Sequence, residues 1–268
     1  MKRDLITNNR FYRATIKIVM KISVCIATYN GEEYIIEQLN SILPQLKEKD
    51  EIVISDDYSS DKTVMLIESL NDSRIKIFYN VKKKGYTGNF ENALNNSSGD
   101  VIFISDQDDI WLPNKTQECL SQLKNFDFVV SDGRVVNSSL SVIYNSFFAI
   151  SKPYSSLMGN IFKFSYLGCC MSFRKELLIK ALPFPENHLL CTHDNWLFLV
   201  AASFYKVKII SEPLILYRRH NSNTSGGRLD KIKKNSILKM IKYRLYLVFN
   251  LVIRINSSVK TPNSSMQQ

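Results

Sequence analysis

The first hundred or so residues alternate between short apolar runs and stretches whose apolar residues recur at helical spacing. Short apolar runs bounded by turn residues are typical of buried strands. They predict strands at residues 22–27, 51–55, 75–79 and 100–105. The helical spacing between them predicts helices at residues 33–46, 62–70 and 89–94. This strand–helix alternation predicts an α/β domain, with a mainly parallel central sheet and helices on both of its faces.

The second half of the chain has a less regular pattern. Its apolar runs predict strands at residues 128–130, 135–136, 168–173, 207–210 and 214–217, and a helix at 194–204. After residue 227 the pattern changes, and apolar residues at helical spacing lie among lysines. They are Ile232, Ile237, Leu238, Ile241, Leu245, Val248 and Val252. We expect this segment to be a basic amphipathic helix.

These patterns divide the chain into three parts: an N-terminal extension at 1–20, a domain at 21–227 and a basic tail at 228–268. Met20 is an alternative start of the protein. No run of about 18 apolar residues is present, so we expect no transmembrane helix. The opening residues lack the apolar core and cleavage site of a signal peptide, so we expect none.

The charge of the chain lies at its ends. The 268 residues have a net charge of +10. Residues 1–21 hold six Lys or Arg and one acid, and residues 228–268 hold nine and one, so the part between them is slightly acidic. A nucleic-acid-binding surface would need a basic body, so we expect no nucleic-acid partner. Basic ends on an acidic body favour an appendage that seeks an anionic surface.

The five cysteines form an odd, scattered set with no zinc-binding spacing. We expect them to be reduced and mostly buried, in a cytosolic protein.

Polar clusters follow three of the predicted parallel strands. They begin at Thr28, at Ser55 and at Asp106. Because ligands of open α/β sheets bind at the carboxyl ends of the strands, the clusters predict one binding site.

The acidic cluster is the strongest single signal. Asp106, Asp108 and Asp109 are three carboxylates within four residues. They repel one another, and Mg²⁺ or Mn²⁺ prefers oxygen ligands of this kind. Asp106 and Asp108 are alternate residues, so both can face one metal ion and a diphosphate. A solvated acidic turn before the helix near Pro113 is an equally good explanation of the motif alone.

The other candidates are weaker when taken singly. Asp56 and Asp57 can accept hydrogen bonds from a ribose or a base, or can form an ordinary Asx turn. Asp194 can act as a general base, or can simply begin a helix. The segment 85–89 opens a helix that can meet a phosphate, although it has neither a Walker nor a dinucleotide-binding fingerprint.

Taken together, the motifs resemble those of the family 2 glycosyltransferases with the GT-A fold, over roughly residues 21–227. The matching segments are ISVCIATYNGEEYI, IVISDDYSSDKT, GYTGNFENAL, GDVIFISDQDDIWLPNK, GCCMSF, HDNWL and LYRRHNSN. DQDDIW followed by HDNW is similar to bacterial enzymes that build O-antigen or capsule repeats on a lipid carrier. The family often has glycine after the paired aspartates, where this chain has Tyr58.

The resemblance implies a role for each candidate residue. The residues implied at the nucleotide-sugar are Thr28, Tyr29, Asn30, Glu32, Asp56, Asp57, Asn89, Asp106, Arg218 and Arg219. The implied ligands of Mn²⁺ or Mg²⁺ are Asp106, Asp108 and His220, with Asp108 the most direct. Asp194 matches the catalytic base.

The resemblance implies an inverting hexosyltransferase. Its donor would be a nucleotide-diphospho sugar, with UDP-galactose or UDP-glucose favoured and dTDP-rhamnose possible. Its acceptor would be a lipid-linked saccharide such as GlcNAc-diphospho-undecaprenol, reached from the cytoplasmic face of the bacterial inner membrane. Two alternatives remain: a sugar nucleotidylyltransferase, and a non-catalytic basic protein that binds membranes or nucleic acid.

Overall fold

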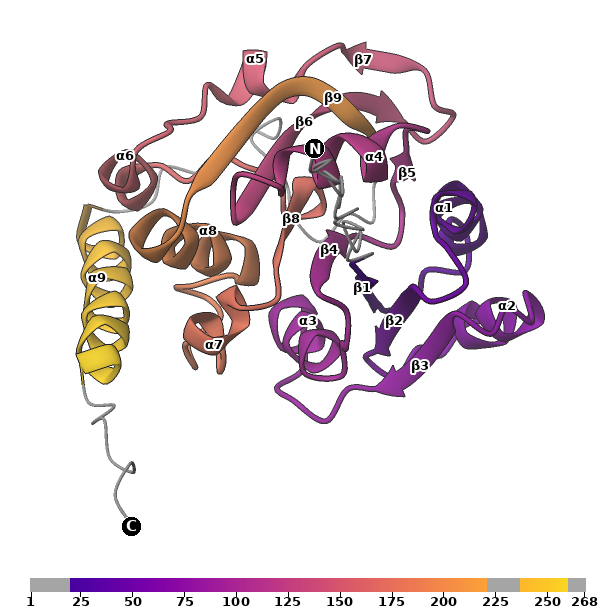
Figure 1. The fold of residues 1–268 in the computed structure, drawn as a ribbon, viewed down its shortest axis with the longest axis horizontal. Helices are drawn as coiled ribbons and strands as arrows, with labels where there is room; N and C mark the ends of the chain where they lie inside the picture. The colour runs from indigo at the N-terminus through magenta and orange to yellow at the C-terminus, as the bar shows by residue number, and fades with distance from the viewer. Residues whose placement is uncertain (1–19, 221–236, 260–268) are drawn as a thin grey trace, which may run out of the picture.

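The computed structural model describes residues 20–220 and 237–259. The strands in these residues are β1 (Ile22–Thr28), β2 (Glu51–Asp56), β3 (Ile75–Tyr79), β4 (Val101–Ser105), β5 (Ile110–Trp111), β6 (Phe128–Asn137), β7 (Val142–Tyr144), β8 (Met171–Arg174) and β9 (Val207–Arg219). They form one sheet in the order β3-β2-β1-β4-β8-β6-β9-β5, with β7 paired to β6 (Figure 1).

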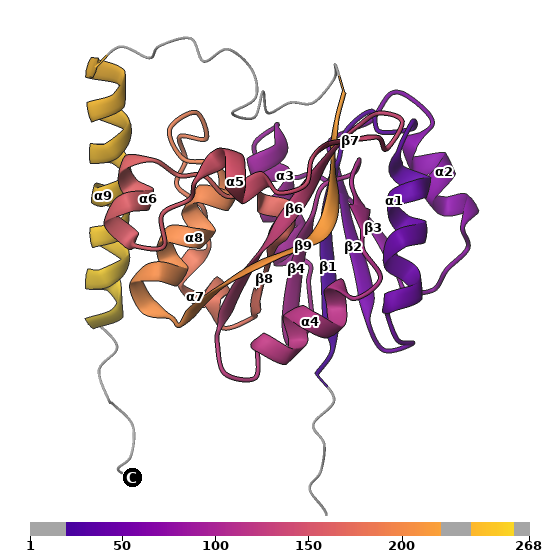
Figure 2. The same ribbon diagram turned by 90° about the horizontal axis from the view of Figure 1, so that it is seen from above.

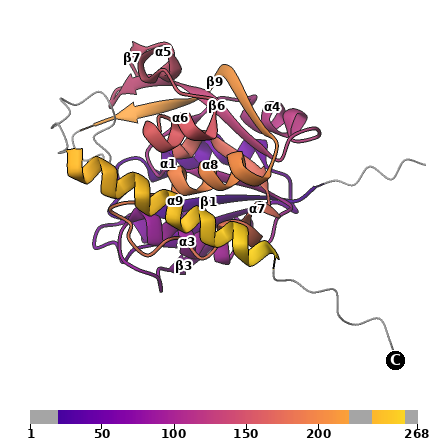
Figure 3. The ribbon, with the colours of Figure 1, turned by 90° about the vertical axis from the view of Figure 1, so that its left-hand side faces the viewer.

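The helices lie around this sheet. They are α1 (Ile35–Ile42), α2 (Thr63–Ser69), α3 (Tyr86–Asn95), α4 (Lys115–Gln122), α5 (Phe147–Ser151), α6 (Leu157–Phe162), α7 (Leu177–Ala181), α8 (His193–Phe204) and α9 (Ile237–Val259), with 3₁₀ turns at Leu43–Gln45 and Gly168–Cys170. Helix α3 lies on one face of the sheet, and α1 and α4 lie on the other (Figures 1 and 3). The predicted covering of both faces is therefore confirmed.

The first half of the sheet is parallel, as predicted. β1 lies between β2 and β4 and pairs with both in parallel, and β3 continues the sheet beyond β2. Nearly every residue of β1 and β2 is buried, without an inside–outside alternation. That pattern is expected of a strand covered on both faces. The four strands end at the same edge, which brings the polar clusters after them together.

The second half of the sheet is mixed. β8 runs antiparallel to both β4 and β6, and β6 pairs in parallel with β9. Helix α8 covers this half, and the ring of Phe198 meets that of Phe128 on β6 edge-on at 6.0 Å. All five cysteines are buried and unpaired, as expected.

Helix α9 lies at the outer edge of the molecule, against α6 and α8 (Figure 2). Leu247 and Leu251 are buried in this contact. The Tyr246 hydroxyl accepts a hydrogen bond of 2.9 Å from the backbone N–H of Asn187, and the Asn195 amide donates to the Tyr243 hydroxyl. The predicted amphipathic helix is thus present from residue 237, and it is part of the folded body.

The apolar stripe predicted from the sequence is not the face that α9 buries. Its members Leu238, Ile241, Leu245, Val248 and Val252 are all exposed, as is Phe249 beside them. Residues 228–236, like the extension at 1–19 and the end at 260–268, lie outside the described residues. Within those that are described, no helix combines the length and the apolar content needed to cross a membrane.

Candidate active site

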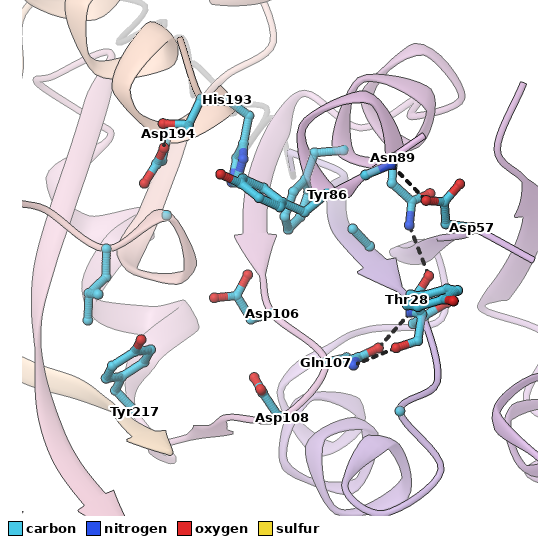
Figure 4. Close-up of a pocket in the computed structure, with 18 of the residues that line it drawn as sticks. Thr28, Asp57, Tyr86, Asn89, Asp106, Gln107, Asp108, His193, Asp194 and Tyr217 are labelled. Carbon is cyan, nitrogen blue, oxygen red and sulfur yellow. Dashed lines mark hydrogen bonds between the residues drawn. The ribbon is translucent and has the colours of Figure 1, made fainter. Parts of the chain in front are cut away.

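A cavity of about 810 Å³ opens where the parallel strands end (Figure 4). Pockets of this size are typical of small-molecule sites. It brings together most of the residues predicted from the sequence. Those that line it are Thr28, Tyr29, Asn30, Asp57, Asn89, Asp106, Asp108, Asp194 and His220. Glu32, Asp56, Arg218 and Arg219 are described by the structure but do not line it.

One side of the cavity is built from the turn after β1. The ring of Tyr29 is 58% exposed, so its face is open to a ligand. Its backbone is held by Gln107: the Tyr29 N–H donates to Gln107 Oε1 at 2.9 Å, and Gln107 Nε2 donates to the Tyr29 carbonyl at 3.1 Å. Gln107, between Asp106 and Asp108 in the acidic motif, therefore fixes the position of the aromatic platform.

Asp57 and Asn89 complete this side (Figure 4). The carboxylate of Asp57 accepts hydrogen bonds from the Asn80 amide at 2.9 Å and from the Gly85 N–H at 2.8 Å. Asn89 donates to the Thr28 carbonyl at 2.9 Å, while its buried Oδ1 has no hydrogen-bond partner among the described residues. Buried polar atoms are normally satisfied, so Oδ1 is available to a ligand.

The carboxylates of Asp56 and Glu32 form hydrogen bonds with the loop that follows β2. Asp56 is fully buried, and its carboxylate accepts from the Thr28 hydroxyl at 2.8 Å and from the N–H and hydroxyl of Ser59 at 2.7 and 2.6 Å. Glu32 accepts from the Lys62 N–H at 2.9 Å. These contacts match the Asx-turn alternative for Asp56, because its oxygens are engaged within the loop.

The acidic motif lies at the floor of the cavity, between its two sides (Figure 4). Burial, together with the charges of Asp109, Asp108 and Asp194, raises the pKa of Asp106 well above its usual range. Burial and the neighbouring Asp108 raise the pKa of Asp109 to about 7. The cluster is therefore electrostatically strained in the absence of a cation.

Five carboxylate residues line the cavity: Glu33, Asp57, Asp106, Asp108 and Asp194. No Lys or Arg is among the described residues that line it. A dianionic ligand such as a nucleoside diphosphate would be repelled here unless a cation accompanied it.

The ligand atoms present fit a hard divalent cation. Asp108 Oδ2 lies 2.8 Å from His220 Nε2, so a carboxylate and an imidazole already converge, with Asp106 beside them in the cavity. Asp106, Asp109 and Cys169 also have ligand atoms within 4.8 Å of one another. Burial raises the pKa of the Cys169 thiol well above its ordinary value. A thiol is also a soft ligand, which suits Mg²⁺ or Mn²⁺ less well than carboxylate oxygens do.

Arg218 supports the acidic motif from behind. It is buried, and its guanidinium donates to the carbonyls of Asp108 at 2.8 Å and Ser138 at 3.0 Å and pairs with Glu37. The backbone N–H of Arg218 donates to Asp109 Oδ1 at 3.0 Å. Arg219 follows at the end of β9. The structure thus places Arg218 against the backbone of the motif.

The opposite side of the cavity begins with Asp194, in the first turn of α8. Asp194 Oδ1 accepts from the Thr192 hydroxyl at 2.5 Å and from the Asn195 N–H at 2.8 Å, which fixes the carboxylate. The cavity also has an aromatic wall that was not predicted, made of Phe147, Phe164, Tyr166 and Tyr217. Phe147, Phe164 and Tyr166 come from segments between strands of the second half, and no motif marks them. Tyr217, on β9, lies within the motif LYRRHNSN but was not predicted to have a role.

One further residue at the site, Gln107, was not predicted to have a role of its own. Gln107 lies within the acidic motif, and His193 directly precedes Asp194. In both motifs the catalytic and metal-binding roles were predicted for the carboxylates. Alternation along the extended segment could have suggested that Gln107 points away from Asp106 and Asp108 and toward a neighbouring strand end.

The comparisons with known proteins agree with this geometry. Residues 23–182 match the family model described as glycosyl transferase family 2. The chain is 27% identical over 242 residues to UDP-Glc:alpha-D-GlcNAc-diphosphoundecaprenol beta-1,3-glucosyltransferase WfgD of Escherichia coli, covering 87% of this chain and 92% of WfgD. It is 31% identical over 236 residues to dTDP-rhamnosyl transferase RfbG of Shigella flexneri, covering 82% of this chain and 80% of RfbG.

Solved structures share the fold. TarS residues 1–349 of S. aureus, in complex with UDP-GlcNAc, align with a TM-score of 0.66 at 19% identity, over 92% of this chain and 68% of that one. The mannosyltransferase PcManGT of Pyrobaculum calidifontis, in complex with GDP-Man and Mn²⁺, aligns with a TM-score of 0.56 at 17% identity, over 92% and 66%. The predicted GT-A fold is confirmed. The family model matches more than half of this chain, and the chain therefore belongs to glycosyl transferase family 2.

Proposed function

We propose that this protein is a metal-dependent, inverting hexosyltransferase that acts on a lipid-linked saccharide. The observation that carries the proposal is the order of groups across one cavity: an aromatic platform, an acidic floor and a fixed carboxylate opposite. UDP-glucose and UDP-galactose are the favoured donors, and dTDP-rhamnose is the third. The names of WfgD, a glucosyltransferase acting on GlcNAc-diphosphoundecaprenol, and of RfbG, a dTDP-rhamnosyl transferase, support this choice.

On this proposal the platform side binds the nucleotide. Tyr29 stacks on the base, and Asp57 and Asn89 accept hydrogen bonds from the nucleoside. Asp106, Asp108 and His220 would hold Mn²⁺ or Mg²⁺, which neutralises charge on the leaving diphosphate when it is bound. Arg218 keeps the backbone of Asp108 in place through its hydrogen bond to that carbonyl.

Asp194 acts on the acceptor. Its carboxylate takes the proton from the acceptor hydroxyl as that oxygen forms a bond to the anomeric carbon. The bond from that carbon to the diphosphate oxygen breaks on the opposite face, so the configuration inverts. The donor's nucleoside diphosphate leaves with the bonding electrons, and the proton remains on Asp194 until solvent takes it. The aromatic wall, with Tyr217 and Tyr166, supplies a surface on which an acceptor sugar can stack.

A donor panel tests this function. The full chain is incubated with Mn²⁺, a GlcNAc-diphospho-lipid and UDP-glucose, UDP-galactose or dTDP-rhamnose, and the lipid is analysed by mass spectrometry. We expect one donor to add a single hexose, with the anomeric configuration opposite to that of the donor. Absence of transfer from all three donors, while the protein binds UDP, would contradict the proposal.

We further propose that the exposed stripe of α9 docks on the cytoplasmic surface of the membrane, where a lipid-linked acceptor lies. The stripe is Leu238, Ile241, Leu245, Val248, Phe249 and Val252. Phe162 on the neighbouring α6 is 57% exposed, and the guanidinium of Arg244 on α9 lies over its ring. Apolar residues on one face of a basic helix can bury at the interface of an anionic membrane. The basic residues concentrated in the tail complement the charge of its headgroups.

Surface substitutions test the docking better than truncation, because α9 also buries Leu247 and Leu251 in the fold. Leu245→Glu with Phe249→Glu should reduce co-sedimentation with phosphatidylglycerol vesicles at least about 10-fold and leave the melting temperature unchanged. Gln117→Glu with Asn125→Asp adds the same charge in and just after α4, away from α9, and should bind like the native protein. Equal vesicle binding by all three proteins would contradict the docking.

A further inference from the structure

His193 is a buried polar side chain whose polar atoms are unused. Its exposure is 5%, yet it contributes to the lining of the cavity. Neither Nδ1 nor Nε2 has a hydrogen-bond partner among the described residues. Leaving a buried donor or acceptor unsatisfied costs about 1–3 kcal/mol. Such a group at the wall of a binding cavity indicates a ligand atom that completes it.

The ring is held firmly in place. It stacks on Phe90 with ring centroids 4.1 Å apart and an angle of 29° between the planes, and Tyr86 meets it edge-on at 5.8 Å. On another side the backbone approaches closely: a Cβ on Gly168 would lie 2.9 Å from Nε2. The imidazole is therefore fixed by packing, and needs no polar partner to hold its orientation.

The imidazole is neutral near physiological pH. Burial lowers the pKa of His193, and this outweighs the opposing effect of the neighbouring Asp194. A neutral imidazole has one N–H donor and one acceptor nitrogen. A hydroxyl group, which both donates and accepts, matches either atom. A phosphate gains less from an uncharged donor, and it would face Asp194 directly beside the ring.

The position of His193 indicates which hydroxyl-bearing ligand it meets. Figure 4 places it between Asp194 on one side and Tyr86 and Asn89 on the other, above Asp106. On the proposed function, the transferred sugar must lie between the nucleotide side and the catalytic carboxylate. We propose that His193 forms a hydrogen bond to a ring hydroxyl of the transferred hexose and selects the donor sugar by that hydroxyl. This inference rests on the proposed function.

A double-mutant cycle between protein and donor tests the contact. His193→Leu removes both polar atoms but keeps an apolar side chain against Phe90, and His193→Gln keeps a donor and an acceptor. kcat/KM is measured for the native enzyme and both variants with the active donor of the panel and with its monodeoxy analogues. The intrinsic reactivity of each analogue cancels, because every analogue is compared across the three proteins.

We expect one deoxy analogue to lose about 10-fold or more with the native enzyme. His193→Leu should lose a similar factor with the full donor and nothing further with that analogue. His193→Gln should recover part of the discrimination. All variants should bind UDP like the native protein, because the contact is to the sugar, and this also reports an intact fold.

Two results would overturn the inference. His193→Leu could lose activity equally with every analogue, which would assign the imidazole to a structural role or to a bound water. It could also retain native activity with the full donor. If His193→Leu fails to bind UDP, the inference is tested by comparing His193→Gln with the native enzyme, using the full donor and the same deoxy analogues. Absence of turnover by the native enzyme with any donor contradicts the proposed function instead.

Discussion

The carboxylates at the cavity floor lie closer together than their charges favour. Asp106 and Asp109 both have raised pKa values, with burial as the main cause and neighbouring aspartates as the second. We therefore expect EDTA to abolish transfer and Mn²⁺ or Mg²⁺ to restore it. Calorimetry should show that UDP binding also weakens in EDTA, because the cavity then repels the diphosphate.

Asp108→Asn separates the metal from other effects. The amide keeps the shape of the side chain and loses its charge, so the variant should fold normally and lose the stabilisation that Mn²⁺ with UDP gives the native protein in a thermal melt. Glu48→Gln, on an exposed residue far from the cavity, is the control. Full activity of the native enzyme in EDTA would contradict the metal requirement.

Gln107 lies against Gly31 and leaves no room there for a side chain. A Cβ on Gly31 would be 2.5 Å from Gln107 Oε1, so Gly31→Ala should push the amide off the backbone of Tyr29. Loss of two hydrogen bonds, each worth about 0.5–1.5 kcal/mol, should weaken UDP binding about 10-fold.

A double variant of Gly31 and Gln107 shows whether the two residues act through the same contact. Gln107→Ala should weaken UDP binding as Gly31→Ala does, and combining the two should add little, because both act through one contact. Additive losses, measured by calorimetry, would show that Gly31 acts by another route.

At the residue scale, the sequence predicted which side chains reach the cavity better than what each does there. The Asp of each motif was visible, but only the structure shows that Asp56 is engaged by Ser59 and Thr28. Tyr58 has a φ of +62°, in the left-handed region that favours glycine. Tyr58 therefore takes the backbone conformation that suits the family's glycine, and Asp57 still lines the cavity.

Among the elements of the fold, Glu51 links the start of β2 to β1, to β3 and to the segment just before β4. It is 2% exposed and accepts hydrogen bonds from Ser23, Ser98 and Lys76. Burial raises the pKa of Glu51, but these hydrogen bonds outweigh it and hold the pKa well below its ordinary value. Glu51→Gln should therefore reduce the free energy of unfolding at pH 7 by about 1.5–3 kcal/mol.

The pH dependence of this loss has a definite sign. Because the folded-state pKa is depressed, the stabilisation is present above the unfolded-state pKa of about 4.5 and is lost as the pH falls below it. The native protein and Glu51→Gln should differ by a constant amount between pH 8 and 5, and converge below that. Denaturant unfolding across this range is the measurement. A constant difference down to pH 3.5 would contradict the assignment.

The first-half elements were predictable because each is a regular, local pattern. The second half contains long strands whose patterns break. β6 was predicted as two strands separated near Gly133, and β9 as two separated near Pro213, yet each continues through with a register shift at Asp132 and Pro213. Glycine and proline normally interrupt strands, and only tertiary pairing shows that the strand resumes. Helices α5, α6 and α7 are too short to show a periodicity.

At the scale of the whole molecule, the cavity needs both halves of the sheet. The platform and the acidic floor come from the β1–β4 half, while Asp194 and the aromatic wall come from the other half. The order of the motifs along the chain predicted that they meet, because parallel strands end at one edge. The wall was not predictable, since it depends on long-range packing of segments with no shared pattern. The direction in which α9 presents its stripe was also settled only by the fold.

The most direct test of the proposed mechanism measures two properties of Asp194→Asn, its transfer rate and its affinity for UDP. The amide keeps the shape of the carboxylate and cannot accept the acceptor's proton. We predict a rate about 10²–10⁴-fold below that of the native enzyme, with UDP binding in Mn²⁺ unchanged, because Asp194 lies across the cavity from the nucleotide side. Near-native transfer by Asp194→Asn would contradict the account.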